Sequence, residues 1–157
     1  MPVSGFRRGR RLGIDVGKAR VGVATSDPDG LLATPVETVP RDDASVARIV
    51  ALADEYSVVE LLVGLPMNLR GEDTASTQDA RDFAAALAAA SVFPVRLVDE
   101  RLSTVSAHAA LRSSGRSQRS SRSIVDQVAA VVLLQQALDV EKSTGRPPGT
   151  PVPQEPA

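Results

Sequence analysis

RLGIDVGKARVGVATS, residues 11–26, sets the architecture of this chain. Residues 12–16 and 21–25 are mostly apolar, and a four-residue link separates them, which predicts two strands joined in a hairpin. A third strand is expected over residues 31–39, where Pro35 marks an edge or an irregularity. Because Asp15 is an acid inside an apolar strand, the same stretch also holds the first candidate functional residue.

The rest of the chain alternates helices and strands. Apolar side chains at helical spacing and capping residues predict helices from Asp42 or Asp43 to about residue 56, and over residues 75–90, 103–112 and 124–142. Apolar runs predict strands over residues 58–64 and 92–98. Helix crossovers between strands imply an α/β fold, with a mixed five-stranded sheet and helices on both faces.

The domain organisation follows from the same pattern. We predict one domain over residues 11–142, preceded by a basic N-terminal segment over residues 1–10. Residues 143–157 hold five of the eleven Pro residues and no apolar periodicity, so we predict a disordered tail there.

The composition excludes several classes of protein. The chain has 157 residues, a length that fits one domain, and is 43% hydrophobic and 24% charged. It has no Cys and one His, which excludes disulfide-rich folds, Cys-bound metals and thiol nucleophiles, and makes a multi-His site or a Ser-His-Asp triad hard to build. Catalysis must therefore rely mainly on carboxylates, hydroxyls, Arg and Lys.

Neither membrane insertion nor secretion is expected. The longest apolar run, residues 83–90, has eight residues, against roughly 18 in a membrane span. Asp15 interrupts the region where a signal peptide would need its apolar core. We expect a cytoplasmic protein without a membrane partner.

The charges are unevenly distributed along the chain. The formal net charge is −1, but residues 1–20 and residues 101–122 each carry +5, whereas residues 23–100 carry −9. Because fields act over a Debye length of about 8–10 Å, local charge matters more than the total. This distribution is compatible with a phosphate-binding face beside a carboxylate cluster.

Acidic residues at three places are candidates for chemistry, and each also has a structural explanation. Asp15 fits either a functional site or an ion pair with Lys18 or Arg20 at the end of the hairpin. Asp99 and Glu100 end the last predicted strand, where open α/β sheets bind ligands, but solvated acids beside a helix cap are equally ordinary. Since successive strand residues point to opposite faces, at most one of the two aims at a given site.

Asp126 is the third position. It fits a functional site, or a capping box with Ser123 three residues earlier. The functional interpretation gains from the combination of acids on a first strand, a last strand and a late helix. Carboxylates are the natural ligands of Mg²⁺ and Mn²⁺, which prefer oxygen donors.

Four motifs together closely resemble the YqgF family, also called RuvX, over about residues 11–140. They are DVG with RVGVA (residues 15–17 and 20–24), VGLPMN with Gly71 (residues 63–68), DERLST (residues 99–104) and VDQVAA (residues 125–130). Members of that family are described as Holliday junction resolvases, or as nucleases that mature the 5′ end of pre-16S ribosomal RNA.

The resemblance implies an RNase H-like fold and metal-dependent phosphodiester cleavage. Asp15, Asp99, Glu100 and Asp126 match the family's acidic catalytic positions, with Asp15, Glu100 and Asp126 as the metal ligands; the choice between Asp99 and Glu100 stays open. In such a site two Mg²⁺ or Mn²⁺ ions about 3.5–4 Å apart activate a water and stabilise the leaving oxygen. Such a site requires no His or Cys.

Basic and amide side chains are expected to contact nucleic acid. Members of the family commonly have Lys before the last acid, where this chain has Arg, so phosphate contacts differ in geometry. Residues 113–123 include no aromatic side chain, which favours backbone contacts over base readout. The candidates are Lys18, Arg20, Asn68, Arg101, Arg112, Arg116, Arg119 and Arg122.

Several alternatives remain at the level of sequence. The partner is an rRNA precursor or branched DNA, and a symmetric junction suits a homodimer whereas end trimming needs only a monomer. A non-catalytic RNase H-like binding module is the alternative function. An actin-like kinase or ATPase, which also has a D-x-G motif, is set aside because those enzymes need two such domains.

Overall fold

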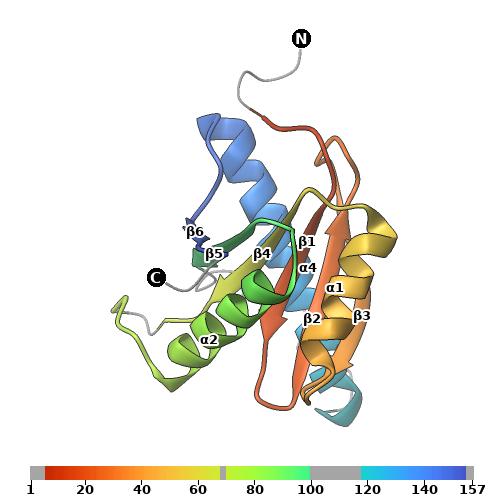
Figure 1. The fold of residues 1–157 in the computed structure, drawn as a ribbon, viewed down its shortest axis with the longest axis vertical. Helices are drawn as coiled ribbons and strands as arrows, with labels where there is room; N and C mark the ends of the chain where they lie inside the picture. The colour runs from red at the N-terminus through yellow and green to blue at the C-terminus, as the bar shows by residue number, and fades with distance from the viewer. Residues whose placement is uncertain (1–5, 68–69, 100–117, 155–157) are drawn as a thin grey trace.

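Six strands form one mixed sheet in the computed structural model (Figure 1). The structure describes residues 6–67, 70–99 and 118–154, with residues 118–126 as helix backbone only. The strand order is β3-β2-β1-β4-β5-β6. Strand β2 pairs antiparallel with both β3 and β1. Strands β1, β4 and β5 run parallel to one another, and β6 is antiparallel to β5. The strands are β1 (Arg11–Val16), β2 (Arg20–Ser26), β3 (Ala33–Pro40), β4 (Glu60–Leu65), β5 (Val95–Asp99) and β6 (Thr150–Val152).

Helices cover both faces of this sheet, as predicted. In Figure 1, α1 (Ser45–Tyr56) and α2 (Ala75–Ala90) lie on the near face, and α4 (Gln118–Thr144) lies on the far face. Alternate residues of β1 therefore enter different cores: Leu12 and Ile14 pack under α1 and α2. Gly13 faces α4, and a Cβ built there would lie 2.8 Å from Cβ of Leu134. Glycine at residue 13 thus lets α4 approach the sheet closely.

The two helices on the near face begin differently. Helix α2 has the predicted bounds and a full capping box, in which Thr74 accepts from the backbone N–H of Thr77 and Thr77 accepts from that of Thr74. Helix α1 begins at Ser45 without a side-chain cap. Asp42 instead accepts from the N–H of Ala44, one residue before the helix. The predicted acidic cap of α1 is therefore wrong in detail.

The C-terminal region differs from the prediction, since the sheet has six strands and not five. The predicted disordered tail contains β6, with Val152 opposite Val95 and Thr150 opposite Leu97. Arg96 stabilises the approach of this segment, because its guanidinium donates to the carbonyl oxygens of Pro148 (2.7 Å) and Gly149 (3.0 Å). A three-residue edge strand bonded through its backbone needs no apolar periodicity, and an edge tolerates Pro, so the sequence pattern could not reveal it.

The remaining differences concern helix ends and membrane insertion. Helix α4 extends beyond the predicted bounds of 124–142 at both ends. The helix predicted over residues 103–112 lies outside the described residues. In the parts of the chain that are described, every helix is too short or too polar to cross a membrane.

Candidate nuclease site

Three parallel strands bring their carboxyl ends to one edge of the sheet. Ile14 of β1 is level with Val63 of β4, which is level with Leu97 of β5. Asp15 comes one residue after this row, and Asp99 comes two residues after it. The first and second predicted acidic positions therefore lie at the same edge, where open α/β sheets bind ligands.

Asp15 lies on the α4 side of the sheet. It alternates with Ile14, which is in the core under α1 and α2, and shares its face with Gly13, which abuts α4. Asp15 is half-buried. A partly buried carboxylate at the end of a strand, facing the helix that carries Asp126, is the arrangement expected of a shared site.

Gln127, in the third turn of α4, lies at the same level of the sheet as Asp15. Asp15 is opposite Gly22 of β2, and Gly22 is opposite Thr38 of β3, so the three form one row across the sheet. Gln127 of α4 donates from Nε2 to Oγ1 of Thr38 at 2.8 Å, which anchors the helix on that row. The backbone of Asp126, the preceding residue, is thereby held at the level of Asp15.

The structure excludes one of the two interpretations of Asp126. Helix α4 begins at Gln118, eight residues before Asp126. A capping box requires its members at the first turn, so the capping interpretation with Ser123 is wrong. The side chain of Asp126 lies outside the described atoms, and its contribution to a metal site stays a prediction.

Asp99 and Glu100 differ in their fit to this site. In β5, Leu97 enters the core under α1 and α2, whereas Val98 enters the core under α4. Alternation places Asp99 with Leu97, on the face opposite to Asp15, and it is exposed there. Glu100 lies outside the described residues. The position of Asp99 favours Glu100 as the ligand.

The predicted nucleic-acid contacts are only partly described. Lys18 is exposed in the turn between β1 and β2, and Arg20 begins β2 half-buried. Arg119 and Arg122 lie on the first turns of α4, as backbone only. Asn68, Arg101, Arg112 and Arg116 lie outside the described residues.

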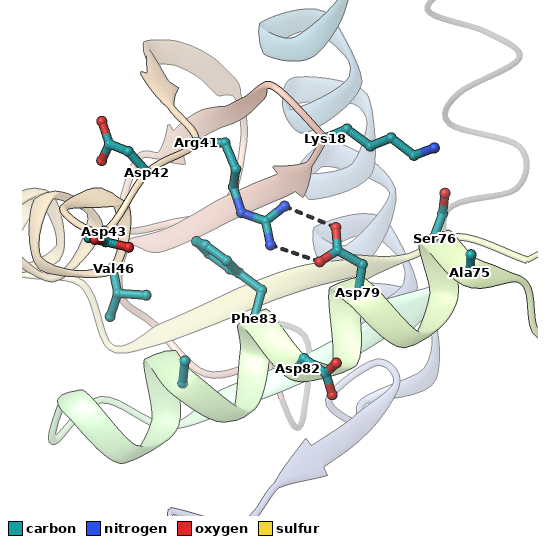
Figure 2. Close-up of a pocket in the computed structure, with 11 residues that line it drawn as sticks. Lys18, Arg41, Asp42, Asp43, Val46, Ala75, Ser76, Asp79, Asp82 and Phe83 are labelled. Atoms are coloured by element: carbon teal, nitrogen blue, oxygen red, sulfur yellow. Dashed lines mark hydrogen bonds and ion pairs between the residues drawn. The ribbon is translucent and has the colours of Figure 1, made fainter.

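A pocket of about 690 Å³ opens on the other face of the sheet, between α1, α2 and the β1–β2 turn (Figure 2). Arg41 crosses it and forms a bidentate ion pair with Asp79 of α2, which lowers the pKa of the Asp79 carboxyl. Sequence reasoning missed both residues. They are 38 positions apart and belong to no motif, so each resembles an ordinary solvated charge. The lining residues are Lys18, Arg41, Asp42, Asp43, Val46, Ala75, Ser76, Asp79, Asp82, Phe83 and Ala86.

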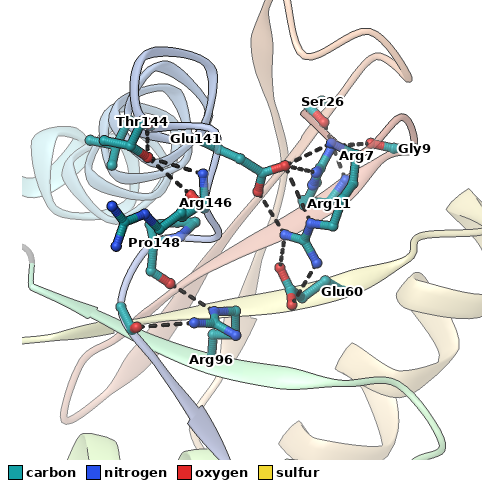
Figure 3. Close-up of polar contacts among 12 residues, drawn as sticks. Arg7, Gly9, Arg11, Ser26, Glu60, Arg96, Glu141, Thr144, Arg146 and Pro148 are labelled. Atoms are coloured by element: carbon teal, nitrogen blue, oxygen red, sulfur yellow. Dashed lines mark hydrogen bonds and ion pairs between the residues drawn. The ribbon is translucent and has the colours of Figure 1, made fainter. Parts of the chain in front are cut away.

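A buried ionic network secures α4 at the opposite end of the sheet (Figure 3). Arg7 donates to Glu141 of α4 at 2.6 Å and to Glu60 of β4 at 2.9 Å, and Arg11 of β1 donates to Glu141 at 2.8 Å. Burial alone would raise the pKa of Glu141, but hydrogen bonds from Arg7 and the charge of Arg11 lower it below its usual value. For Arg11 the effect of burial prevails: burial lowers the pKa of its guanidinium, although the negative charge of Glu141 acts to raise it. The network connects the last turns of α4 to β1 and, through Arg7, to β4.

The donor set at the carboxyl edge fits a hard divalent cation. The predicted ligands Asp15, Glu100 and Asp126 offer only carboxylate oxygens, the donors that Mg²⁺ and Mn²⁺ prefer. Within the described ranges no three acids or histidines are close enough to hold a metal. Of the three predicted ligands, Glu100 lies outside those ranges and Asp126 is described as backbone only.

The chain is similar to known proteins along most of its length. The model of the RuvX family, described as Holliday junction resolvase, matches residues 9–140. A proposed pre-16S rRNA nuclease of Clavibacter michiganensis subsp. michiganensis is 60% identical over 151 residues, which cover 94% of both chains. A protein of the same name from Leifsonia xyli subsp. xyli is 60% identical over 149 residues, covering 94% of this chain and 96% of the other.

Solved structures show the same fold. Thermus thermophilus RuvC in complex with Holliday junction substrate superposes with a TM-score of 0.55 at 17% identity, covering 91% of this chain and 99% of that chain. A second structure of Thermus thermophilus RuvC gives a TM-score of 0.54 with the same identity and coverage. The predicted RNase H-like fold is thereby confirmed.

Proposed function

The chain belongs to the RuvX family, and we propose that it is a divalent-metal-dependent nuclease that hydrolyses phosphodiester bonds in structured nucleic acid. Two substrates follow from the comparisons: the names of the relatives point to pre-16S rRNA, and the family description points to the Holliday junction. We expect the protein to act in the cytoplasm, as a monomer or a homodimer.

One observation carries the proposal. Asp15 lies at the carboxyl end of β1, faces α4, and occupies the register row on which Gln127 anchors that helix. A strand acid and the neighbour of Asp126 in the helix therefore lie along one row of the sheet, which supports a shared site. Helix capping does not explain Asp126, because α4 begins eight residues earlier.

The metal would be held by Asp15, Glu100 and Asp126. When bound, a divalent cation lowers the pKa of a water and neutralises charge on the phosphate in phosphodiester hydrolysis. The chain's part is to hold the three carboxylates: β1 orients Asp15 from the sheet, and α4, fixed at its far end by Glu141, holds Asp126. We assign Glu100 and not Asp99 on the alternation of β5.

Substrate binding is assigned to the surrounding cations. Lys18 and Arg20 flank the turn that directly follows the Asp15 strand end. The Arg-rich residues 101–122 lie between β5 and the body of α4 in sequence, which supports a role beside the same edge. Contacts to phosphates from these side chains would position the backbone without reading bases. The further candidates are Asn68, Arg101, Arg112, Arg116, Arg119 and Arg122.

A cleavage assay tests the proposal. Wild type and Asp15→Asn are incubated with a pre-16S rRNA leader and with a four-way DNA junction, in Mn²⁺ and in EDTA. We expect only the wild type with metal to cut, and the preferred substrate identifies the biology. Asp54→Asn, which removes an exposed carboxylate from α1, is the matched control and should retain full activity.

The same variants separate a nuclease from a binding module. If the acids hold metal, Mn²⁺ raises the melting temperature of the wild type and not of Asp15→Asn, because a ligand that binds only the folded state stabilises it. Binding of nucleic acid without cleavage, and without a Mn²⁺ shift, would establish the non-catalytic alternative.

A further inference from the structure

Arg41 joins two elements that lie on either side of the pocket in Figure 2. It follows β3 directly, and its two terminal nitrogens bind the two oxygens of Asp79 on α2, at 2.9 and 2.8 Å. The guanidinium also lies over the ring of Phe83, 5.0 Å from the centroid. Arg41 is thus held in one orientation by α2, through an ion pair and a cation–π contact.

In this orientation Arg41 forms two hydrogen bonds to the turn that follows β1. Nη1 donates to the carbonyl oxygen of Gly17 at 2.9 Å, and the backbone N–H of Arg41 donates to that of Ala19 at 2.9 Å. Two carbonyls of the four-residue turn between Val16 and Val21 are therefore fixed by one residue.

The turn is also closed by a backbone hydrogen bond of its own. The N–H of Gly17 donates to the carbonyl oxygen of Arg20 at 2.8 Å, and a Cβ at residue 17 would lie 2.6 Å from that oxygen. The turn begins two residues after Asp15 and carries Lys18 at its exposed side. A displacement of the turn would move both the proposed ligand strand and the proposed phosphate contact.

Helix α2 holds the neighbouring strand end as well. Oγ1 of Thr77, two residues before Asp79, donates to the carbonyl oxygen of Pro66, just after β4 ends. The first two turns of α2 thus contact the end of β4 directly and the end of β1 through Arg41. These are two of the three parallel strands whose carboxyl ends form the proposed site.

We propose that the Arg41–Asp79 pair is a positioning device for the proposed nuclease: it fixes the β1–β2 turn, and through it the placement of Asp15 and Lys18 on the substrate. The inference rests on the proposed function for its catalytic consequence. Arg41 and Asp79 act through the turn and do not touch the substrate. Because both side chains are partly exposed, at 23% and 38%, their ion pair contributes little to global stability, so a catalytic effect can be separated from unfolding.

The first readout is hydrogen exchange of the free protein, which requires neither metal nor activity. In Arg41→Ala we expect the amide of Gly17 to exchange at least about tenfold faster, while amides in the middle of β1 and β4 keep wild-type rates. The matched control is Arg48→Ala, which removes another bidentate ion pair, from Arg48 of α1 to Glu37 of β3 at 2.9 and 2.6 Å. The control should leave Gly17 protected.

The second readout is a split between kcat and KM. We expect Arg41→Ala and Asp79→Asn to lower kcat by about 10- to 100-fold, the range for groups that support a metal ligand. KM should rise by less than about threefold, because Lys18 is only one of the eight candidate nucleic-acid contacts. The double variant should be no worse than Arg41→Ala, because the two residues act as one unit. Arg48→Ala should keep wild-type kcat.

Two results would contradict the inference, and a third would contradict the proposed function. Wild-type exchange at Gly17 in Arg41→Ala would overturn the inference, and so would a kcat equal to that of Arg48→Ala. If the wild type cuts no substrate, the proposed function fails and the catalytic part of the inference fails with it. Exchange at Gly17 then still decides whether Arg41 fixes the turn. Melting curves of each variant show whether it is folded. If Arg41→Ala does not fold, the same measurements are made on the isosteric variant Asp79→Asn.

Discussion

Arg11 and Asp15 lie on the same face of β1, four residues apart, and their surroundings differ sharply. At the Arg11 end, two arginines and two glutamates meet in one buried network, in which Arg11, Glu60 and Glu141 are each no more than 2% exposed. At the Asp15 end, the chain brings acidic positions from a strand and a helix to one edge of the sheet. Charges of both signs meet in the first region, and the second is where we propose that a divalent cation binds.

The difference shows two uses of buried charge. Among the described residues, every buried side-chain nitrogen or oxygen has a hydrogen-bond partner. The network at the Arg11 end is therefore complete, and a complete network holds its elements in one arrangement. The network also affects the Asp15 end of the sheet, because the same helix, α4, carries Glu141 in its last turns and Asp126 in its first half. One helix thus connects a structural region to a proposed catalytic one.

The largest expected effect comes from opening the network. Glu141→Gln removes the charge that Arg7 and Arg11 share, and should lower the free energy of unfolding by about 3–5 kcal/mol, since it leaves a buried arginine uncompensated. Urea unfolding followed by circular dichroism measures the change. Glu55→Gln, on the exposed side of α1, is the control. A loss below about 1 kcal/mol would show that the two ends do not differ as described.

The second prediction concerns the other end of the same helix. Asp126→Asn should lower the cleavage rate by more than about a hundredfold. Loss of a residue that only supports a metal ligand lowers activity by about 10- to 100-fold, so a larger loss would identify Asp126 as a ligand. The free energy of unfolding should fall by less than about 1 kcal/mol, the size of a helix cap. Asp139→Asn, exposed on α4, should affect neither quantity. Full activity in Asp126→Asn would remove the metal site from this edge.

The third prediction tests the basic segment before α4. Arg116→Ala with Arg119→Ala should flatten the dependence of log affinity on log salt, for a four-way DNA junction, by about 1.8, or 0.9 per lost phosphate contact. Filter binding between 50 and 200 mM salt, in EDTA, measures the slope. Arg8→Ala with Arg48→Ala removes the same charge from exposed positions elsewhere. Equal slopes for the two double variants would place the binding face outside residues 116–119.

The smallest effect is a difference in pH dependence. The pKa of Glu141 is lower in the folded protein than its ordinary value of 4.5, so its stabilising contribution is complete above about pH 4.5 and is lost as pH falls through the lower folded pKa. Stability of the wild type should therefore fall more steeply below pH 4.5 than that of Glu141→Gln, by up to about 1.4 kcal/mol per pH unit. Parallel curves would show that Glu141 does not titrate in this way.

The sequence predicted the central part of the fold because its signals are local. The hairpin from β1 to β2, the apolar run of β4 and the Ala-rich α2 each depend on neighbours in the chain, and each formed close to the predicted residues. Strand β6 has no such signal, since its three residues are specified by backbone bonds to β5 and by Arg96. A compositional rule therefore mistook it for part of a tail.

The candidate site divides in the same way. Asp15 and Asp126 stand out as isolated acids within motifs, and the structure brings the strand of one to the helix of the other. Glu60 is a single acid within the otherwise apolar residues 58–64, and its ion pair with Arg7 joins residues 53 positions apart. Such partners follow from the packing of α4 and the N-terminal segment onto the sheet, which no local pattern contains.

The Arg7–Arg11–Glu60–Glu141 network also has a consequence for synthesis of the chain on the ribosome. Glu141 is made 130 residues after Arg11, so strands β1, β2, β3 and β4 emerge long before their buried arginine has its partner. A nascent chain that ends before α4 must keep Arg11 hydrated, because burial of an unpaired guanidinium is unfavourable. We therefore expect the sheet to consolidate late, once α4 has been released. A translational pause before residue 141 would then hold the chain in an open state.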